Sequence, residues 1–285
     1  MSRAPAPAVA AALLAAAAAL LYLPGLPGEF VYDDHRLIAD NAGLERPFDV
    51  RRAFLRDYYA SDLDRMGLGY YRPVAVLSTE ADYRAWGGAP LGFHVTNLAL
   101  HAACTVLVFA LGLALLEGAT AAAAAGALWF AAHPSHAESV AFISGRVDPL
   151  ATLAGLAAVL LWLRARRSAR PLLARSAAAA AWLVALLSKE MAVTVPLVIL
   201  LLDAARDGPP GRTDLGRRLK AYLPLAVAGA LYVGLRAIGL GRLLAPPTGA
   251  PLASPVDFLA VYQPVKGLAH FNYRSPIDLE PFVRR

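Results

Sequence analysis

The chain has 285 residues, of which 58% are hydrophobic and 17% are charged, and its mean hydropathy is positive. This composition is far more apolar than that of an ordinary soluble domain and indicates a protein embedded in a bilayer. The net charge of +6 does not indicate nucleic-acid binding, because the basic residues cluster in short stretches between apolar runs. The single cysteine, Cys104, excludes an intrachain disulfide.

Seven apolar runs approach the length of roughly 20 residues that a helix needs to cross a membrane. We predict spans at about 5–24, 93–116, 120–133, 149–163, 172–187, 191–203 and 219–240. The first run is interpreted as an uncleaved anchor, because no small-residue cleavage motif follows it. The predicted fold class is an all-α polytopic membrane protein, with residues 1–240 as a transmembrane domain and 241–285 as a terminal stretch.

Arginine and lysine are densest in two short loops, 164–170 and 205–220. Both loops are predicted to be cytoplasmic, because cytoplasmic loops of membrane proteins carry an excess of these residues. Alternation of the spans then assigns the outer side to the following segments: 25–92, 134–148, 188–190 and the residues after 240.

The first outer loop, 25–92, carries two segments with helical periodicity. We predict a helix on the membrane surface over 50–58, where Val50, Phe54, Leu55 and Tyr58 share one face. A second helix is predicted over 34–40 in "FVYDDHRLIADN", with Asp33 as its N-cap. The adjacent acids Asp33 and Asp34 are interpreted either as caps or as catalytic groups. The two interpretations are compatible, because a helix N-terminus favours an ionised carboxylate.

A polar stripe is predicted on the second span, where His94, Asn97 and His101 are spaced i, i+3 and i+7 and so share one helical face. Polar side chains at membrane depth are costly unless they are paired or face a wet cavity. Hydrogen bonding between helices and lining of a cavity both remain open for this stripe. Metal binding is disfavoured, because no cysteine or carboxylate joins these residues on the same helix.

The densest polar cluster lies in "HPSHAESVAFISGRVDPLATL", residues 133–153, and contains His133, His136, Glu138, Arg146 and Asp148. Pro134 and Gly145 interrupt the helix, and irregular backbone at this depth is tolerated mainly where it lines protein or water. The cluster therefore favours a binding site. Chelation of a divalent ion by the histidines with Glu138, and binding of an anion together with Arg146, both fit these residue types.

Basic residues elsewhere on the same side extend this cluster. Lys189 and Glu190 join two spans, and Tyr71 and Arg72 lie in "GYYRPV" near the end of the first outer loop. Guanidinium and ammonium groups suit a phosphate whose lipid tail lies in the bilayer. A carboxylate from the first outer loop would then accept the proton of an incoming hydroxyl while the phosphate leaves a sugar carbon.

Five ordered motifs resemble those of the transmembrane O-mannosyltransferases targeting cadherins and their bacterial tetratricopeptide-bearing relatives, over about residues 20–205. The motifs are "FVYDDHRLIADN", "YYRPV", "FHVTNLALHAACTVLVF", "FAAHPSHAESVAFISGRVDPLA" and "LLSKEMAVTVPLVILLLD". The resemblance implies a GT-C type helical bundle and a glycosyltransferase that moves a hexose, expected to be mannose, from a polyprenyl-phosphate donor to a protein hydroxyl. It also implies an outer-face active site and an inverting transfer without metal or cofactor.

The expected site combines the residue chemistry with this resemblance. The resemblance assigns catalysis to Asp33 and Asp34. We expect the donor phosphate to be bound by Arg72, His133, His136, Arg146 and Lys189, and the site to be supported by Tyr71, His94, Asn97, His101, Glu138, Asp148 and Glu190.

Two other functions remain open. A transporter would line a path with the same residues, but it predicts polar groups near the bilayer midplane and internal repeats, and neither is evident. The same chemistry on a lipid or glycan acceptor is the other alternative.

High use of Ala, Arg, Gly and Pro suggests a GC-rich bacterial genome, and hence an inner membrane with the site on the periplasmic side. The resemblance includes further spans and repeats that this chain lacks, which fits a truncated reading frame.

Overall fold

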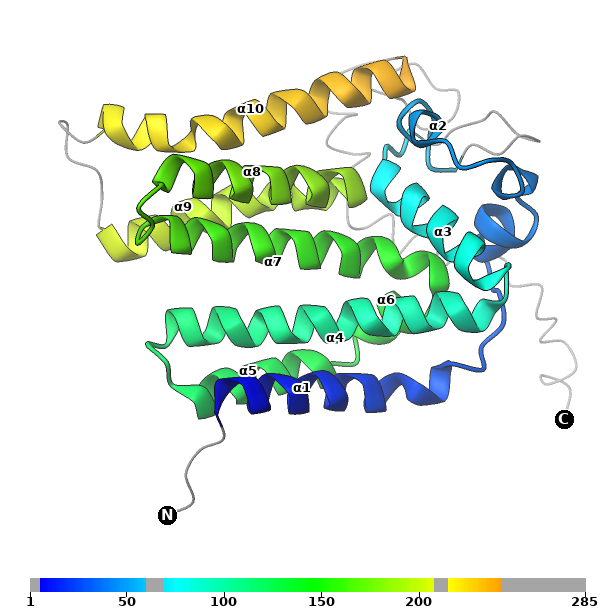
Figure 1. Ribbon diagram of the computed structural model, residues 1–285, viewed down its shortest axis with the longest axis horizontal. Helices are drawn as coiled ribbons and strands as arrows, with labels where there is room; N and C mark the ends of the chain where they lie inside the picture. Colours follow the sequence, from blue (N-terminus) through cyan, green and yellow to red (C-terminus); the bar gives the residue numbers. More distant parts are fainter. Residues whose placement is uncertain (1–5, 60–68, 208–214, 242–285) are drawn as a thin grey trace, which may run out of the picture. The chain divides into compact units, whose positions relative to one another are not determined.

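The computed structural model describes residues 6–59, 69–207 and 215–241. Within these ranges the secondary structure is helical and contains no β-strand (Figure 1). The predicted all-α fold class is confirmed. Residues 242–285, predicted to be an outer terminal stretch, lie outside the described residues.

The α-helices have the following bounds: α1 Pro7–Tyr22, α2 Val50–Phe54, α3 Pro73–Trp86, α4 Pro90–Leu115, α5 Thr120–Ala132, α6 His136–Ala141, α7 Val147–Ala165, α8 Pro171–Ser188, α9 Val195–Asp207 and α10 Leu215–Leu240. Short helical turns connect them: η1 Leu23–Gly25, η2 His35–Ala39, η3 Ala42–Leu44, η4 Ile143–Arg146 and η5 Glu190–Thr194.

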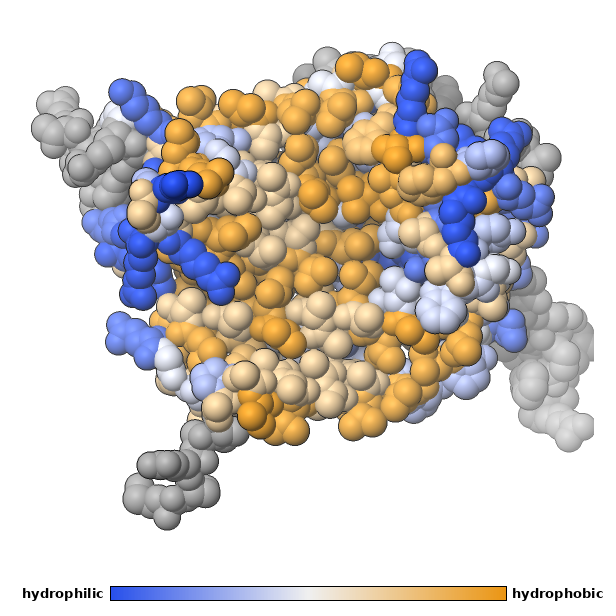
Figure 2. All heavy atoms as spheres, viewed as in Figure 1, coloured by the Kyte–Doolittle hydropathy of each residue, from blue (hydrophilic) through white to orange (hydrophobic). Residues whose placement is uncertain are grey.

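All seven predicted apolar runs form helices. Five helical segments of the described chain are long and apolar enough to cross a membrane, namely Pro7–Gly25, Pro90–Leu115, Ile143–Ala165, Pro171–Ser188 and Leu219–Leu240. Helices α5 and α9 have 13 residues each, fewer than the roughly 20 that a perpendicular span requires. Figure 2 shows hydrophobic side chains over the middle of the helices and hydrophilic ones at both ends, as a bilayer-embedded bundle requires.

The two ends of the bundle differ in what they carry. One end, here called the loop end, carries the described parts of the first loop, residues 25–59 and 69–89, together with α6, η4 and η5 (Figure 1). The other end, here called the basic end, carries the arginine-rich connection between α7 and α8. Sequence reasoning predicts that the loop end is the outer one.

Small residues let the helices approach one another closely. Helix α7 packs against α4 and α8, while α8 also packs against α10. A Cβ added to Gly112 would lie only 2.9 Å from the Cβ of Ala123, so the backbones of α4 and α5 are in near contact. Such approach is the main source of packing energy between helices in lipid, where the hydrophobic effect does not drive association.

The first loop departs from its predicted structure in two places. Helix α2 ends at Phe54 and does not continue to residue 58, because the amide of Tyr58 donates to the carbonyl of Tyr70 at 2.8 Å and turns the chain away. The predicted shared face is therefore wrong: Val50 and Leu55 are exposed while Tyr58 is buried. Helix α3 was not predicted, because its sequence mixes polar and apolar residues without a clear stripe.

The predicted helix over 34–40 is a π-helical turn at His35–Ala39. Leu37 and Ile38 face the apolar side, as predicted, and both are buried. Asp33 is not its N-cap: Asp34 occupies that position, and its side chain makes no capping hydrogen bond. The reason is that both carboxylates have partners elsewhere.

A buried acid joins three helices at the basic end. The carboxylate of Asp203 on α9 accepts hydrogen bonds from Nε1 of Trp162 at 2.9 Å and from the hydroxyl of Tyr222 at 2.6 Å. It also pairs with Nη1 of Arg166 at 3.1 Å. Because these partners lie on α7 and α10, Asp203 fixes the short helix α9 against both long ones.

Replacing this acid should destabilise the bundle. We expect Asp203→Ala to lower the free energy of unfolding by about 1–3 kcal/mol, because it leaves the indole and hydroxyl donors without their acceptor and removes one of the two acids that bind Arg166. The thermal unfolding midpoint of the detergent-solubilised chain measures this effect. Asp49→Ala, at an exposed acid of the first loop, is the control and should leave the midpoint unchanged. Equal midpoints for the two variants would contradict the role of Asp203.

Candidate active site at the loop end

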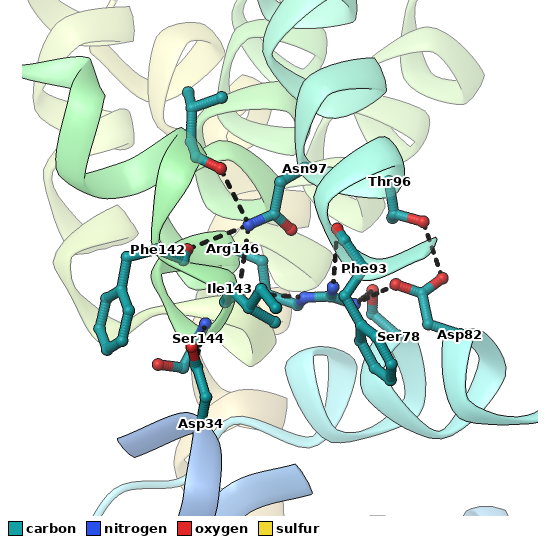
Figure 3. Close-up of polar contacts among 11 residues, drawn as sticks. Asp34, Ser78, Asp82, Phe93, Thr96, Asn97, Phe142, Ile143, Ser144 and Arg146 are labelled. Carbon is teal, nitrogen blue, oxygen red and sulfur yellow. Dashed lines mark hydrogen bonds and ion pairs between the residues drawn. The ribbon is translucent and has the colours of Figure 1, made fainter. Parts of the chain in front are cut away.

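Asp34 is fully buried and ties the first loop to the turn before α7. Its Oδ1 accepts a hydrogen bond from the backbone amide of Ser144 at 2.8 Å (Figure 3). Its Oδ2 accepts one from the amide of Val31 at 3.2 Å. Both carboxylate oxygens are thus bound to backbone donors. Asp34 is therefore enclosed in this structure, and its hydrogen bonds hold the turn that contains Asp33.

Asp33, by contrast, presents its carboxylate to solvent. The hydroxyl of Tyr59 donates a hydrogen bond to Oδ2 of Asp33 at 2.9 Å. Burial and the neighbouring charge of Asp33 raise the pKa of Tyr59, so that this hydroxyl keeps its proton and remains a donor. The structure therefore separates the two predicted acids into one exposed group and one internal group.

Arg146 is fully buried and is held by groups on α3 and α4 (Figure 3). Its Nη1 pairs with Oδ2 of Asp82 on α3 at 2.6 Å, and its Nη2 donates to the carbonyl of Phe93 on α4 at 3.3 Å. The hydroxyl of Thr96 donates to the other oxygen of Asp82 at 2.8 Å. In this arrangement the guanidinium of Arg146 is not available to a phosphate. It stabilises the joint between the first loop and the bundle.

The polar stripe on α4 makes hydrogen bonds to neighbouring segments. Nδ2 of Asn97 donates to carbonyl oxygens on the link between α6 and η4, at 3.1 Å to Phe142 and 3.2 Å to Ile143 (Figure 3). Nε2 of His94 lies 3.1 Å from the carbonyl of Gly28. Nε2 of His101 lies 3.1 Å from the carbonyl of Ala131. The stripe therefore fixes the elements that surround the candidate site.

Arg72 pairs with Glu190 across a sequence distance of 118 residues. Nε and Nη2 of Arg72 bind the two oxygens of Glu190 at 3.1 and 2.8 Å. The guanidinium also lies over the rings of Tyr58 and Tyr70, at 5.5 and 4.5 Å from their centroids. Tyr71 is buried and donates to the carbonyl of Phe54 at 3.2 Å. A forked ion pair with stacked rings holds the guanidinium in one orientation.

The charge of Arg72 affects the pKa values of Tyr58 and of its own partner Glu190. Burial raises the pKa of Tyr58 to about 12, although the charges of Arg72 and Arg146 act in the opposite direction. Burial also tends to raise the pKa of Glu190, but the hydrogen bonds and charge of Arg72 outweigh it, so the net pKa lies below its usual 4.5. Glu190 is therefore ionised near neutral pH.

Lys189 and the histidine cluster form the other part of the loop end. The ammonium of Lys189 pairs with Asp148 at the start of α7, and both side chains are partly exposed. The ring of His136 lies 6.1 Å from that of His133, centroid to centroid. Burial and then the charge of His133 lower the pKa of His136, which favours the neutral imidazole at pH values near 7. Glu138 is exposed on α6.

Pairwise contacts at the loop end connect some of the predicted residues, and we call this set the rim. The rim contains Tyr59, which was not predicted, and the predicted residues Asp33, Arg72, Glu190, Lys189, Asp148, His136 and His133. Tyr58 lies within electrostatic range of Asp33, Asp34, Arg72 and Arg146, so the acid turn and both guanidinium groups surround the same tyrosine.

Three residues of this arrangement were missed at the level of sequence. Asp82 and Thr96 lie in segments that gave no chemical motif, and Tyr59 is one aromatic among several in the first loop. A charged residue within a half-apolar helix is a weak signal for Asp82. Within the described ranges, no group of three His, Cys, Asp or Glu side chains is placed to hold a metal ion.

Comparisons with known proteins identify relatives. The chain is 40% identical to Protein O-mannosyl-transferase Tmtc2 of Drosophila melanogaster over 220 residues, which are 75% of this chain and 23% of that protein. It is 38% identical to Protein O-mannosyl-transferase Tmtc1 of the same species, over 70% of this chain and 23% of that protein. Identity to human Protein O-mannosyl-transferase TMTC4 is 31%, over 81% and 36% of the respective chains.

The chain therefore spans roughly a quarter to a third of the length of these curated relatives. No family model matches the sequence, and no solved structure matches it.

Removing one charge of the buried pair Asp82 and Arg146 should destabilise the fold more than removing both. We expect Asp82→Asn to lower the free energy of unfolding by about 3–5 kcal/mol, because it leaves a buried guanidinium without its counter-charge. The double variant Asp82→Leu with Arg146→Met should regain most of this loss, since both desolvated charges are then removed. Thermal unfolding in detergent measures both. A double variant as unstable as Asp82→Asn would contradict this interpretation.

The ion pair of Arg72 and Glu190 predicts a pH dependence of stability. Because the folded-state pKa of Glu190 is depressed, its contribution is present above the unfolded-state value of 4.5 and is lost as the pH falls through the folded value. Stability of the wild type should therefore decrease more steeply below pH 4.5 than that of Glu190→Gln. Unfolding midpoints measured across this range test it, and parallel pH profiles would count against the pair.

Proposed function

We propose, from the homology of this chain to the transmembrane O-mannosyltransferases targeting cadherins, that it is the membrane domain of a glycosyltransferase. The proposed substrates are a polyprenyl-phosphate hexose, mannose in our proposal, and a hydroxyl of a protein acceptor. The observation that carries the proposal is that an exposed acid, Asp33, and a cation, Arg72, meet the same pair of contacting tyrosines. Tyr59 donates a hydrogen bond to Asp33, and the guanidinium of Arg72 lies over the ring of Tyr58.

Asp33 is the proposed general base. The oxygen of the acceptor hydroxyl attacks the anomeric carbon of the sugar, and its proton passes to the carboxylate of Asp33. The bond from the anomeric carbon to the phosphate oxygen breaks, and its electron pair leaves with the lipid phosphate. Attack opposite the leaving group inverts the anomeric centre. Asp34 does not take part directly, because backbone amides bind both of its oxygens.

The leaving phosphate is proposed to bind at Lys189, His133 and His136. Lys189 is suited to this role because its ion pair with Asp148 is partly exposed, so a phosphate oxygen can compete for the ammonium. Arg72 pairs with Glu190, the residue that follows Lys189, and supplies a second positive charge at the rim. We propose that Arg146 acts through the fold instead, since its guanidinium is enclosed.

The proposed location follows from charge and hydropathy. With the arginine-rich basic end in the cytoplasm, the rim faces the outer side, which is the periplasm if the chain belongs to a bacterial inner membrane. A lipid-linked donor then keeps its chain in the bilayer and presents its sugar at the rim. The proposed step uses protein side chains alone.

Substitution of the two acids should separate chemistry from folding. We expect Asp33→Asn to reduce transfer by about 10²–10⁴-fold with an unchanged unfolding midpoint, because only the base is lost. Asp34→Asn should lower the unfolding midpoint, because the amides of Ser144 and Val31 lose a charged acceptor. The measurement is transfer of labelled mannose from a polyprenyl-phosphate donor to protein in membranes containing the full chain.

Asp40→Asn is the matched control, since Asp40 is an exposed acid of the same loop segment. It should transfer sugar at the wild-type rate. Undiminished transfer by Asp33→Asn would rule out this residue as the base. Absence of transfer by the wild-type chain with this donor would contradict the proposed substrate.

A further inference from the structure

Tyr32 has a backbone conformation that its side chain disfavours. Its φ angle is +48°, in the left-handed region, and its side chain is 87% exposed. Among the described residues, the other non-glycine residue with positive φ is Glu117, in the turn between α4 and α5. Steric repulsion between Cβ and the following carbonyl disfavours this region for a bulky residue. Such residues concentrate at ligand-binding and catalytic positions.

The surrounding contacts impose this conformation. The amide of Asp34 donates to the carbonyl of Val31 at 3.0 Å, and the amide of Val31 donates back to the carboxylate of Asp34 at 3.2 Å. Asp34 is in turn fixed by the amide of Ser144. Tyr32 lies between these anchored residues and therefore projects outward.

The ring of Tyr32 rests with its edge against a second aromatic. Its centroid is 6.3 Å from that of Phe142, and the two planes make an angle of 85°. Phe142 follows α6, the helix that begins at His136. The contact fixes the direction of the ring but leaves most of its surface in solvent. Core packing therefore does not explain why a large aromatic side chain occupies a position better suited to glycine.

The ring belongs to the residue before the proposed base and contacts the segment that follows α6. Asp33, the proposed base, is the next residue in the chain, and Phe142 connects the ring to the segment of the proposed phosphate-binding histidines. In a displacement the sugar must lie between the base and the leaving phosphate. Hexoses present an apolar C–H face that packs on aromatic rings while their hydroxyls remain free to bind water or polar groups.

We propose that the ring of Tyr32 is a contact surface for the hexose of the lipid-linked donor. This inference rests on the proposed function, and it assigns the sugar moiety, as distinct from the phosphate or the lipid, to this side chain. The strained backbone at Tyr32 is retained because it presents the ring beside Asp33.

The test compares binding of two lipids, so that it does not depend on turnover. A short-chain polyprenyl-phosphate mannose and the same polyprenyl phosphate without sugar are titrated into the detergent-solubilised full chain. We expect Tyr32→Gly to weaken binding of the sugar-bearing lipid by about two- to tenfold, which is the range for one aromatic contact, and to leave binding of the sugar-free lipid unchanged. Tyr32→Phe keeps the ring and should bind both lipids as the wild type does.

Stability provides the second readout. Tyr32→Gly should keep or raise the unfolding midpoint, because glycine accepts positive φ without strain. Glu117→Gly makes the same backbone change away from the rim, and it should likewise keep or raise the midpoint while leaving the affinity for both lipids unchanged.

The outcomes separate this inference from the proposed function. Equal weakening for both lipids would overturn the sugar assignment, and so would a loss in Tyr32→Phe as large as that in Tyr32→Gly. Unchanged binding in Tyr32→Gly would overturn it too, and would identify the ring as an anchor in the membrane interface. Failure of the proposed function would appear differently, as absence of binding of the sugar-bearing lipid to the wild-type chain.

Discussion

The contact on which the loop end depends is the one between the carboxylate of Asp34 and the backbone amide of Ser144. It joins two segments 110 residues apart and is shielded from solvent. A charged acceptor on a buried amide is a strong hydrogen bond, because little water competes for either group. The positions of Tyr32 and Asp33 follow from it, since both residues belong to the turn that Asp34 anchors.

Two cations of the rim are each paired with an acid of the chain. Arg72 with Glu190 and Lys189 with Asp148 place cations near the surface without leaving any of them alone at the edge of a low-dielectric bundle. Each pair is differently enclosed: the first is largely buried, whereas the second is open to solvent. An incoming anion therefore exchanges partners most easily at Lys189. This difference in burial makes Lys189 the more accessible of the two cations.

At each end of the bundle a buried acid joins an arginine to a hydroxyl group on another helix. At the loop end Asp82 joins Arg146 to the hydroxyl of Thr96, and at the basic end Asp203 joins Arg166 to the hydroxyl of Tyr222. Both networks replace the missing hydrophobic driving force between membrane helices by polar bonds. The network of Asp203 stabilises the helix packing. The network of Asp82 does the same and lies near the acid turn.

The sequence alone determined the helical membrane class, the apolar runs and the residue types that the rim contains, because hydropathy and the cost of charge at membrane depth are local properties. It also determined that Leu37 and Ile38 face the core. It did not separate Asp33 from Asp34, since adjacent residues share one motif and their accessibility depends on Ser144. The enclosure of Arg146 by Asp82, the end of α2 at Phe54 and the strained backbone of Tyr32 arise from contacts between distant segments. Only the tertiary structure decided these, because burial and partner choice are set by what packs against a residue.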